Sequence, residues 1–146
     1  MHIVLADSDA LSNVALLFDH YRVFYDQLSN RHDAEQFVAE RLRNQDSTIF
    51  LALAESIGVG FTQLYPSFSS VSMRRVWILN DLFVLSSYRR QGIATQLMQV
   101  AADYARETGA IRLVLATQKN NMAAQALYQS LGYQPDLTFD HFALKL

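Results

Sequence analysis

The chain has 146 residues, of which 51% are hydrophobic and 18% charged, a composition that fits one globular domain over residues 1–146 and excludes a disordered chain. It contains no cysteine, which excludes disulfide bonds and thiolate metal sites, and its four histidines are scattered, so we expect no metal. The net charge of −2 argues against nucleic-acid binding. No apolar run is long enough to span a membrane and the opening MHIVLADSD lacks a basic signal-peptide region, so we expect a cytoplasmic protein without membrane contact.

The charged side chains are unevenly distributed along the chain. Residues 1–60 carry nine acidic and four basic side chains, whereas residues 61–146 carry five acidic and eight basic ones. In a functional interpretation one half faces a cation and the other an anion. Ordinary variation of the surface charge explains the difference equally well.

Hydrophobic periodicity predicts a series of strands and helices. In chain order we expect a strand at residues 3–6, helices at 10–28 and 33–44, strands at 47–55 and 58–66, a loop at 68–72, a strand at 74–85, a helix at 91–108, a strand at 111–117, a helix at 121–131 and a last strand at 139–145. Asp33 is the expected N-cap of the second helix, and Gly109 and Gly132 suit the ends of the last two helices. The order β-α-α-β-β-β-α-β-α-β describes a mixed α+β domain with one central, mostly antiparallel sheet flanked by about four helices.

The stretch YRRQGIAT at residues 88–95 is a basic turn between a predicted strand and a predicted helix. A helix N-terminus exposes unpaired N–H groups and carries a partial positive charge, and Gly92 lets a ligand approach the backbone closely. Arg89 and Arg90 add full charges and forked donors that match phosphate oxygens. The turn therefore predicts a pyrophosphate site, and the alternative is a solvated arginine pair. The backbone amides of this site belong to Gln91, Gly92, Ile93, Ala94 and Thr95.

Two motifs resemble those of the GNAT superfamily of acyl-CoA N-acyltransferases. The first is R-x-x-G-x-A after the strand NDLFV, with Ala94 at a position where the family pattern allows glycine or alanine. The second is N-x-x-A-x-x-LY followed by LGY, carried by Asn121, Ala124, Leu127, Tyr128, Leu131, Gly132 and Tyr133. The resemblance covers the element order of the whole chain and is densest over residues 76–133. The wording LNDLFVLSSYRRQGIA looks closest to the polyamine acetyltransferase branch.

The resemblance implies the GNAT fold and an N-acetyltransferase that uses acetyl-CoA as co-substrate. The implied acceptor is a primary amine of a small cationic metabolite, such as a polyamine, an aminoglycoside or an amino-acid-like compound, which attacks directly in a ternary complex. Two alternatives stay open, namely an enzyme that modifies protein lysines or N-termini and a non-catalytic sensor of acyl-CoA. A homodimer through a sheet edge also fits the family.

Three residues of the second motif receive roles from the resemblance. Tyr128 is the implied general acid for the departing thiolate and a cofactor contact, with a core aromatic as the alternative. Asn121 is implied to bond the pantetheine arm, with Ala124 as a further cofactor contact. A plain helix N-cap explains Asn121 equally well.

The strand before the basic turn receives the remaining roles in catalysis. The resemblance places acetyl-CoA along Leu82, Phe83 and Val84, with the Val84 N–H as the donor to the thioester oxygen. Asp81 is the best carboxylate for a general base, and a water held by Asn80 or Asp81 and backbone carbonyls is an equal alternative. A further alternative is that Asp81 only satisfies neighbouring backbone groups. Adjacent strand residues point to opposite faces, so Asn80 and Asp81 share a face only if the strand contains a bulge.

The acceptor side is implied by family resemblance and by aromatic side chains that could surround an ammonium group. The candidate substrate-binding residues are Tyr21, Phe24, Tyr25, Tyr65, Phe68, Trp77 and Asn80, with His141 near the last strand. Asp19 and Asp26, in the acidic half of the chain, hint at a cationic acceptor. For the aromatic residues, a place in the core is the alternative.

Overall fold

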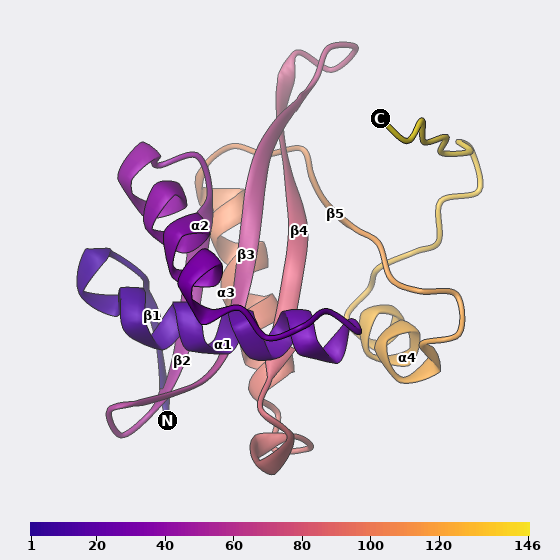
Figure 1. Ribbon diagram of the computed structural model, residues 1–146. Coiled ribbons are helices and arrows are strands. Elements are labelled where there is room, and N and C mark those ends of the chain that lie inside the picture. The colour runs from indigo at the N-terminus through magenta and orange to yellow at the C-terminus, as the bar shows by residue number, and fades with distance from the viewer. The chain divides into compact units, whose positions relative to one another are not determined.

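A five-stranded sheet in the order β1-β2-β3-β4-β5 organises residues 1–116 (Figure 1). The strands are β1 (His2–Leu5), β2 (Thr48–Ala54), β3 (Ile57–Ser69), β4 (Arg74–Val84) and β5 (Arg112–Leu115). Every neighbouring pair is antiparallel except β4 and β5, which are parallel. The computed structural model describes residues 1–146, which form two compact units at 1–116 and 117–146. The expected α+β class with a mostly antiparallel sheet is confirmed.

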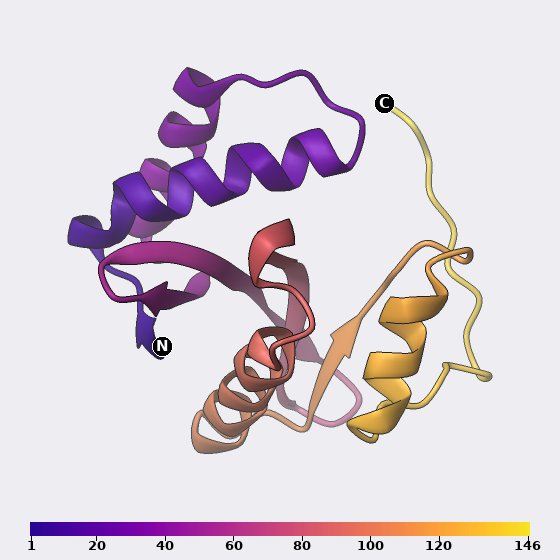
Figure 2. The ribbon, with the colours of Figure 1, turned by 90° about the horizontal axis from the view of Figure 1, so that it is seen from below.

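Helices cover both faces of this sheet (Figure 2). One face packs against α1 (Leu11–Phe24) and α2 (Arg31–Asn44), and the other packs against α3 (Ile93–Glu107). The apolar side chains of α3 recur every four residues, which places one stripe of the helix against the sheet. The buried core under α1 and α2 consists of Val14, Leu17, Val38, Ile49, Leu51, Phe61 and Phe83. None of the helices has both the length and the apolar character needed to cross a membrane.

Two helix boundaries differ from the sequence prediction for local reasons. The helix α1 ends at Phe24 rather than at residue 28, because Asp26 has a left-handed backbone with φ 63°. The expected N-cap Asp33 is wrong, because α2 is capped by Asn30. The Asn30 Oδ1 accepts from the Asp33 N–H at 3.1 Å, and the Asn30 Nδ2 donates to the Asp33 carboxylate at 2.8 Å. Asp33 therefore completes the cap from inside the helix.

The hairpin of β3 and β4 extends beyond the other strands (Figure 1). The β2 partner of β3 ends at the pair Thr48–Leu64, and the β5 partner of β4 begins at the pair Val76–Arg112, so only the tip of the hairpin at 68–75 is a two-stranded ribbon. The expected loop at 68–72 is correspondingly shorter, because β3 continues to Ser69 and the turn occupies 70–73. This ribbon carries the exposed side chains of Phe68, Val71 and Met73.

Residues 117–146 form the second unit, which contains α4 (Met122–Ser130). Asn121 is its N-cap and accepts from the Ala124 N–H at 3.2 Å, and Gly132, with φ 92°, follows its end. The expected strand at 139–145 is wrong, since these residues adopt no strand. The apolar side chains of Phe139, Phe142 and Leu144 do not alternate strictly, and all three are exposed. A segment with no single apolar face and no ladder partner has nothing to hold it as a strand.

Candidate active site

The basic turn ends in a helix N-terminus that no side chain caps. Gly92 is the N-cap of α3, and its carbonyl accepts the first helical bond from the Gln96 N–H at 3.0 Å. The N–H groups of residues 93–95 precede that bond, so they are available to an external acceptor. Arg90 and Gly92 both have left-handed backbones, with φ 61° and 80°. Such alternation turns successive N–H groups toward one side, which is the arrangement that binds phosphate.

The two arginines of the turn are held differently. The Arg89 Nε donates to the Val84 carbonyl at 2.9 Å, and its guanidinium lies over the rings of Phe24 and Phe83 at 5.3 and 5.7 Å. Arg89 therefore anchors the turn to β4 and α1, and its terminal nitrogens remain as donors. Arg90 is exposed on the turn itself. The charge at the start of α3 is thus strongly positive.

A β-bulge interrupts β4 at the residue before the candidate base. In the β3–β4 ladder Gln63 pairs with Asp81 and Leu64 pairs with Leu79, so Asn80 is an extra residue of β4 without an opposite partner. A bulge of this kind places two consecutive side chains on nearly the same side of the strand. The Asn80 Nδ2 donates to the Asp81 carboxylate at 3.1 Å, which adjacent residues of a regular strand cannot do.

The bulge also changes which face of the sheet each half of β4 presents. Trp77 and Asp81 are four residues apart and would share a face of a regular strand. Instead, the Trp77 indole donates to the Thr108 hydroxyl at the end of α3 at 2.8 Å, whereas Asp81 accepts from the Tyr21 hydroxyl of α1. The bulge therefore brings Asp81 to the α1 face and leaves Trp77 on the α3 face.

Asp81 is a buried carboxyl group, 4% exposed, surrounded by donors. The Gln63 Nε2 donates to one carboxylate oxygen at 2.7 Å, Asn80 donates to the other, and Tyr21 also donates. Burial raises the pKa of Asp81 above its usual range, and the three hydrogen bonds oppose that rise. Burial likewise raises the pKa of Tyr65 to about 12, so this hydroxyl stays protonated at neutral pH. A carboxyl group with a raised pKa is suited to take a proton near neutral pH.

The backbone of Val84 lies at an edge of β4 that faces away from β3. The Leu85 N–H donates to the Val59 carbonyl across the ladder at 2.9 Å, and alternate residues of an antiparallel strand face their partner. The Val84 N–H and carbonyl therefore point the other way, where the carbonyl accepts from Arg89. The ladder between β4 and β5 stops at Leu79, so no strand partner takes up the Val84 N–H. The Val84 N–H is therefore left without a partner in the β-ladder.

Some of the predicted acceptor residues come together beside Asp81. Tyr21, Phe24 and Tyr25 form an aromatic group, with ring centroids 5.0 Å apart for Tyr21 and Tyr25 and 5.3 Å apart for Phe24 and Tyr25. Tyr65 joins from β3, because its hydroxyl accepts from the Gln63 Nε2 at 3.2 Å.

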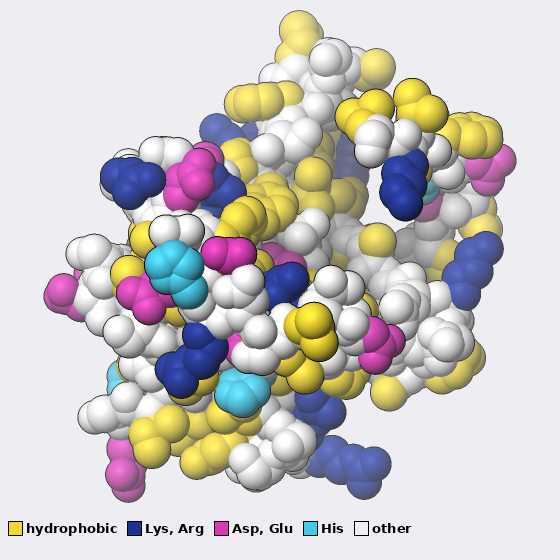
Figure 3. Space-filling model, in the orientation of Figure 1, with side chains coloured by type: hydrophobic (Ala, Val, Ile, Leu, Met, Phe, Trp, Pro, Cys, Tyr) yellow, Lys and Arg dark blue, Asp and Glu magenta, His cyan; other side chains and the backbone are white.

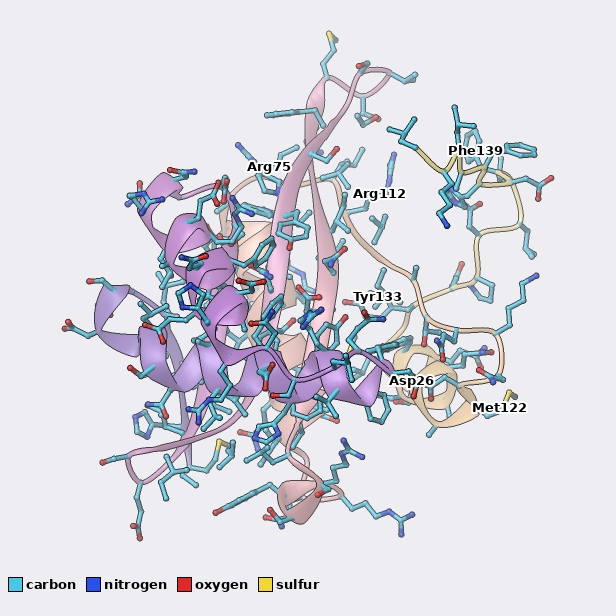
Figure 4. The ribbon with its side chains drawn as sticks, in the orientation of Figure 1. Asp26, Arg75, Arg112, Met122, Tyr133 and Phe139 are labelled. Atoms are coloured by element: carbon cyan, nitrogen blue, oxygen red, sulfur yellow. The ribbon has the colours of Figure 1, made fainter.

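Other predicted acceptor residues lie elsewhere. Trp77 packs with α3, and Phe68 lies on the outer hairpin, stacked under the Arg75 guanidinium. Arg75 comes from β4 near Arg112 of β5 (Figure 4). Asp19 is fully engaged, since its carboxylate accepts from the Ser29 hydroxyl at 2.6 Å and the Asn30 N–H at 2.7 Å. It therefore holds the connection between α1 and α2.

Asp26 lies at the end of α1 (Figure 4). In the second unit, His141 approaches Asp136 at 3.6 Å.

A cavity and a buried amide were not predicted from the sequence. A cavity of about 300 Å³ is lined by Arg41, Asp46, Tyr65 and Pro66. Arg41 bridges Glu40 at 3.0 Å and Asp46 at 2.8 Å, so two carboxylates surround one guanidinium. Figure 3 shows acidic and basic side chains side by side over α2. No sequence pattern marked this cavity, because its lining residues come from different elements.

The buried amide is that of Gln63, which lies on β3 between Phe61 and Tyr65 on the same face of the strand. A polar residue on an otherwise apolar strand face is the signal that would have found it.

The second unit carries the remaining predicted residues. Asn121 caps α4, Ala124 supplies the N–H that this cap binds, and Tyr128 lies one turn further along the helix. Tyr128 is half-buried, with its ring centroid 6.2 Å from that of Tyr133. The expected cap at Asn121 is confirmed, and its role toward a cofactor stays a prediction.

Comparison with known proteins links these features to one family. The model of the acetyltransferase (GNAT) family matches residues 14–133. The chain is 44% identical over 146 residues to the Uncharacterized N-acetyltransferase YhfO of Bacillus subtilis, which covers 100% of this chain and 98% of the relative. It is 26% identical over 122 residues to the aminoglycoside N(6')-acetyltransferase type 1 of Salmonella typhimurium, which covers 80% of this chain and 84% of the relative.

Solved structures agree with these relatives. A crystal structure of "a probable acetyltransferase" superposes with a TM-score of 0.96 at 44% identity, covering 100% of this chain and 98% of the other. An aminoglycoside N-acetyltransferase in complex with CoA shares the fold, with a TM-score of 0.82 at 20% identity and coverage of 99% and 95%. The family match spans the four strands β2 to β5, the uncapped α3 N-terminus and α4. This chain is an acyltransferase (EC 2.3.1.-) that belongs to the GNAT family of acetyl-CoA-dependent N-acetyltransferases.

Proposed function

We propose that the protein transfers the acetyl group of acetyl-CoA to a primary amine of a small cationic metabolite, by direct attack in a ternary complex. The observation that carries this proposal is the uncapped, basic N-terminus of α3 on the same chain segment as a buried carboxyl group at Asp81. The helix N-terminus can bind a pyrophosphate, and the carboxyl group can accept a proton from an amine. We propose residues 1–146 as a single N-acetyltransferase domain.

The N-terminus of α3 binds the pyrophosphate of acetyl-CoA in this proposal. The amides of Gln91, Gly92, Ile93, Ala94 and Thr95 and the side chains of Arg89 and Arg90 supply its donors. The anchored position of Arg89 supports this, because its terminal nitrogens are held near the turn by the Val84 carbonyl and two rings. The residues Leu82, Phe83 and Val84 line the acyl end, and Asn121 and Ala124 contact the pantetheine arm.

The chemistry requires a neutral amine, a donor to the thioester oxygen and a proton for the departing sulfur. Asp81 takes the amine proton, directly or through a water held with Asn80, while the amine nitrogen bonds to the acyl carbon. The Val84 N–H stabilises the oxygen as the carbon–sulfur bond breaks. Tyr128 donates its hydroxyl proton to the thiolate and regains a proton from solvent.

A cationic acceptor is supported by the charges near Tyr65. Beside the cavity of Arg41, Asp46, Tyr65 and Pro66, the Arg41 guanidinium is bridged to Asp46, which lines the cavity, and to Glu40, which does not, so this ion-pair cluster carries a net negative charge. Tyr21, Phe24 and Tyr25 add aromatic faces that attract ammonium groups. The name of the aminoglycoside N(6')-acetyltransferase relative points to the same class of acceptor.

Calorimetry with acetyl-CoA tests the cofactor site. Arg90→Ala should weaken binding by about tenfold or more, because a charge-assisted bond to phosphate is lost. The matched control is Arg106→Ala at the other end of α3, where the side chain is exposed and paired with Asp103, and binding should be unchanged. Equal affinity in the wild type and Arg90→Ala would remove Arg90 from the site, and no binding by folded wild-type protein would refute the acetyl-CoA site.

A catalytic role is separated from acyl-CoA sensing by Tyr128→Phe. We expect kcat to fall by about a hundredfold with unchanged affinity for acetyl-CoA. Tyr133→Phe is the control, since it removes the hydroxyl of the neighbouring ring. Turnover that survives in Tyr128→Phe would remove this hydroxyl from the mechanism.

The acceptor class is tested by an amine panel that includes diamines, aminoglycosides and neutral or acidic amines. Cationic amines should show the highest kcat/KM. Acetylation of only neutral or acidic amines would refute the proposed class, and transfer of labelled acetyl groups into lysate proteins would favour a protein-modifying enzyme. Sedimentation equilibrium tests the homodimer that the family resemblance suggests.

A further inference from the structure

We propose that Gln63 is a positioning residue that orients the Asp81 carboxyl group and, through a buried hydrogen bond, lowers its affinity for a proton. The inference rests on the proposed function only where it links this proton affinity to catalysis. Neither sequence motif includes Gln63, and its role follows from the hydrogen bonds around the bulge of β4.

The amide of Gln63 is almost completely buried, at 1% exposure, and all of its hydrogen-bonding groups have partners. Its Nε2 donates to the Asp81 carboxylate at 2.7 Å and to the Tyr65 hydroxyl at 3.2 Å. Its Oε1 accepts from the Ser47 hydroxyl at 2.9 Å. A side-chain amide has two N–H donors, so both are in use.

The Asp81 carboxylate fixes the direction in which the amide points, because an ionised carboxylate only accepts and must face Nε2. The Ser47 hydroxyl, which can donate or accept, completes this arrangement by donating to Oε1. An amide does not change its protonation, so this donor persists at every pH of interest. Since a donor favours the charged form of a carboxyl group, Gln63 lowers the proton affinity that burial raises.

The other groups around Asp81 come from several elements. Tyr21 of α1 and Asn80 of β4 also donate to it, and Tyr65 of β3 lies beyond Gln63. Arg41 and Asp46, which form an ion pair with each other, lie near Tyr65 at the cavity. The Gln63 bond to Asp81, at 2.7 Å, is shorter than the Asn80 bond at 3.1 Å, and Gln63 is almost completely buried. If Gln63 is removed, water therefore cannot replace its hydrogen bond to Asp81.

The strand pairing and a backbone contact both hold Gln63 beside Asp81. Gln63 and Asp81 are direct partners in the β3–β4 ladder, and the register shifts immediately beside them. The main chain around Asp81 is fixed separately, because the Thr62 hydroxyl donates to the Asp81 carbonyl at 2.8 Å. Thr62 is 0% exposed and adjacent to Gln63, but it touches the backbone of Asp81 rather than its carboxylate.

The experiment is an NMR titration of the Asp81 carboxyl carbon in the full-length protein, combined with the pH profile of kcat/KM. In Gln63→Leu we expect Asp81 to bind its proton about tenfold more tightly. The acidic limb of the kcat/KM profile should then move to higher pH by about one unit. Thr62→Val is the matched control, which removes a buried hydrogen bond to the same residue and should leave the titration unmoved. Gln63→Glu keeps the shape of the side chain and should raise the proton affinity further, because two adjacent carboxyl groups share a proton.

The two readouts separate this inference from the proposed function. An unmoved Asp81 titration in Gln63→Leu, or in Gln63→Glu if the first variant does not fold, overturns the inference. A moved titration supports it. If the titration moves and the activity profile does not, Gln63 still sets the proton affinity of Asp81, and Asp81 is not the base of the reaction.

Discussion

At Asp81, three hydrogen-bond donors converge on a carboxyl group whose pKa is raised by burial and lowered by these hydrogen bonds. The result is a compromise in which the group stays able to accept a proton but destabilises the fold when it is ionised. Groups of this kind concentrate at functional sites, where they serve the reaction at a cost in stability.

Asp81→Asn should therefore increase stability and abolish most activity. The folded pKa of Asp81 is raised above its ordinary value of 3.8, so ionisation costs stability as the pH rises from that value through the folded pKa. The variant lacks this penalty, and we expect its melting temperature to exceed that of the wild type at pH 7 and to match it below pH 3.8. Loss of a general base should lower kcat/KM by about a hundredfold or more.

Thermal melts at a series of pH values measure this difference. The control is Asp46→Asn, which changes an exposed carboxylate next to Arg41 and should show no such pH-dependent gain. A melting temperature of Asp81→Asn below that of the wild type at pH 7 would show that the ionised group stabilises the fold.

Among the elements, α3 does the most to define the candidate site, because its apolar stripe fixes it on the sheet while its first turn stays uncapped. Gly92 has a left-handed backbone with φ 80°, and a Cβ added there would have only the Gln96 Nε2, at 4.0 Å, as a neighbour. The left-handed conformation at this position, rather than a close contact, requires glycine.

Gly92→Ala should destabilise the protein by about 1–2 kcal/mol and also weaken acetyl-CoA binding by roughly tenfold. Gly109→Ala, beyond the other end of α3, is a closely matched control with φ 78° and open space. It should lose similar stability and keep its affinity. Denaturant unfolding and calorimetry give the two quantities, and equal affinity in both variants would contradict a ligand role for the first turn of α3.

The elements that follow from local patterns were predictable from the sequence. The period of the apolar residues placed α3 within two residues at its start, and the turn and Gly92 marked where it begins. The cap of α2 was misplaced, because Asn30 and Asp33 cap jointly and only the structure shows which residue stands outside the helix. The last expected strand failed because β-propensity does not supply a ladder partner.

The site was predictable only in part, because register is a property of two strands together. The sequence indicated that Asn80 and Asp81 share a face only with a bulge, but the bulge itself depends on how Leu64 and Leu79 pair. Gln63 was missed for the same reason, since its importance comes from standing opposite Asp81.

For the whole molecule, the charge distribution matters more than the net charge of −2. The acidic excess of residues 1–60 includes Glu40 and Asp46 near Tyr65, and the basic excess of residues 61–146 includes Arg89 and Arg90 of the turn. In the proposed function, this distribution would attract a polyanionic co-substrate and a cationic acceptor to different parts of one small protein.

Acetyl-CoA binding should weaken as the salt concentration rises. Between about 0.05 M and about 0.5 M salt we expect a loss of about threefold to tenfold, because ions screen the attraction of arginines for phosphates. Arg90→Ala should show a shallower dependence, and Arg106→Ala should follow the wild type. Calorimetry across the salt series measures the slopes, and a flat wild-type slope would contradict electrostatic capture.

The extra residue at Asn80 divides β4 into two parts whose side chains alternate in opposite phase. In the part before Asn80, Trp77 faces α3, and in the part after it, Asp81 faces α1. Deleting Asn80 would restore regular alternation along β4 and move either the Trp77 indole or the Asp81 carboxyl group to the opposite face of the sheet. The number of residues between Trp77 and Asp81 is therefore as important for the candidate site as the identity of those residues.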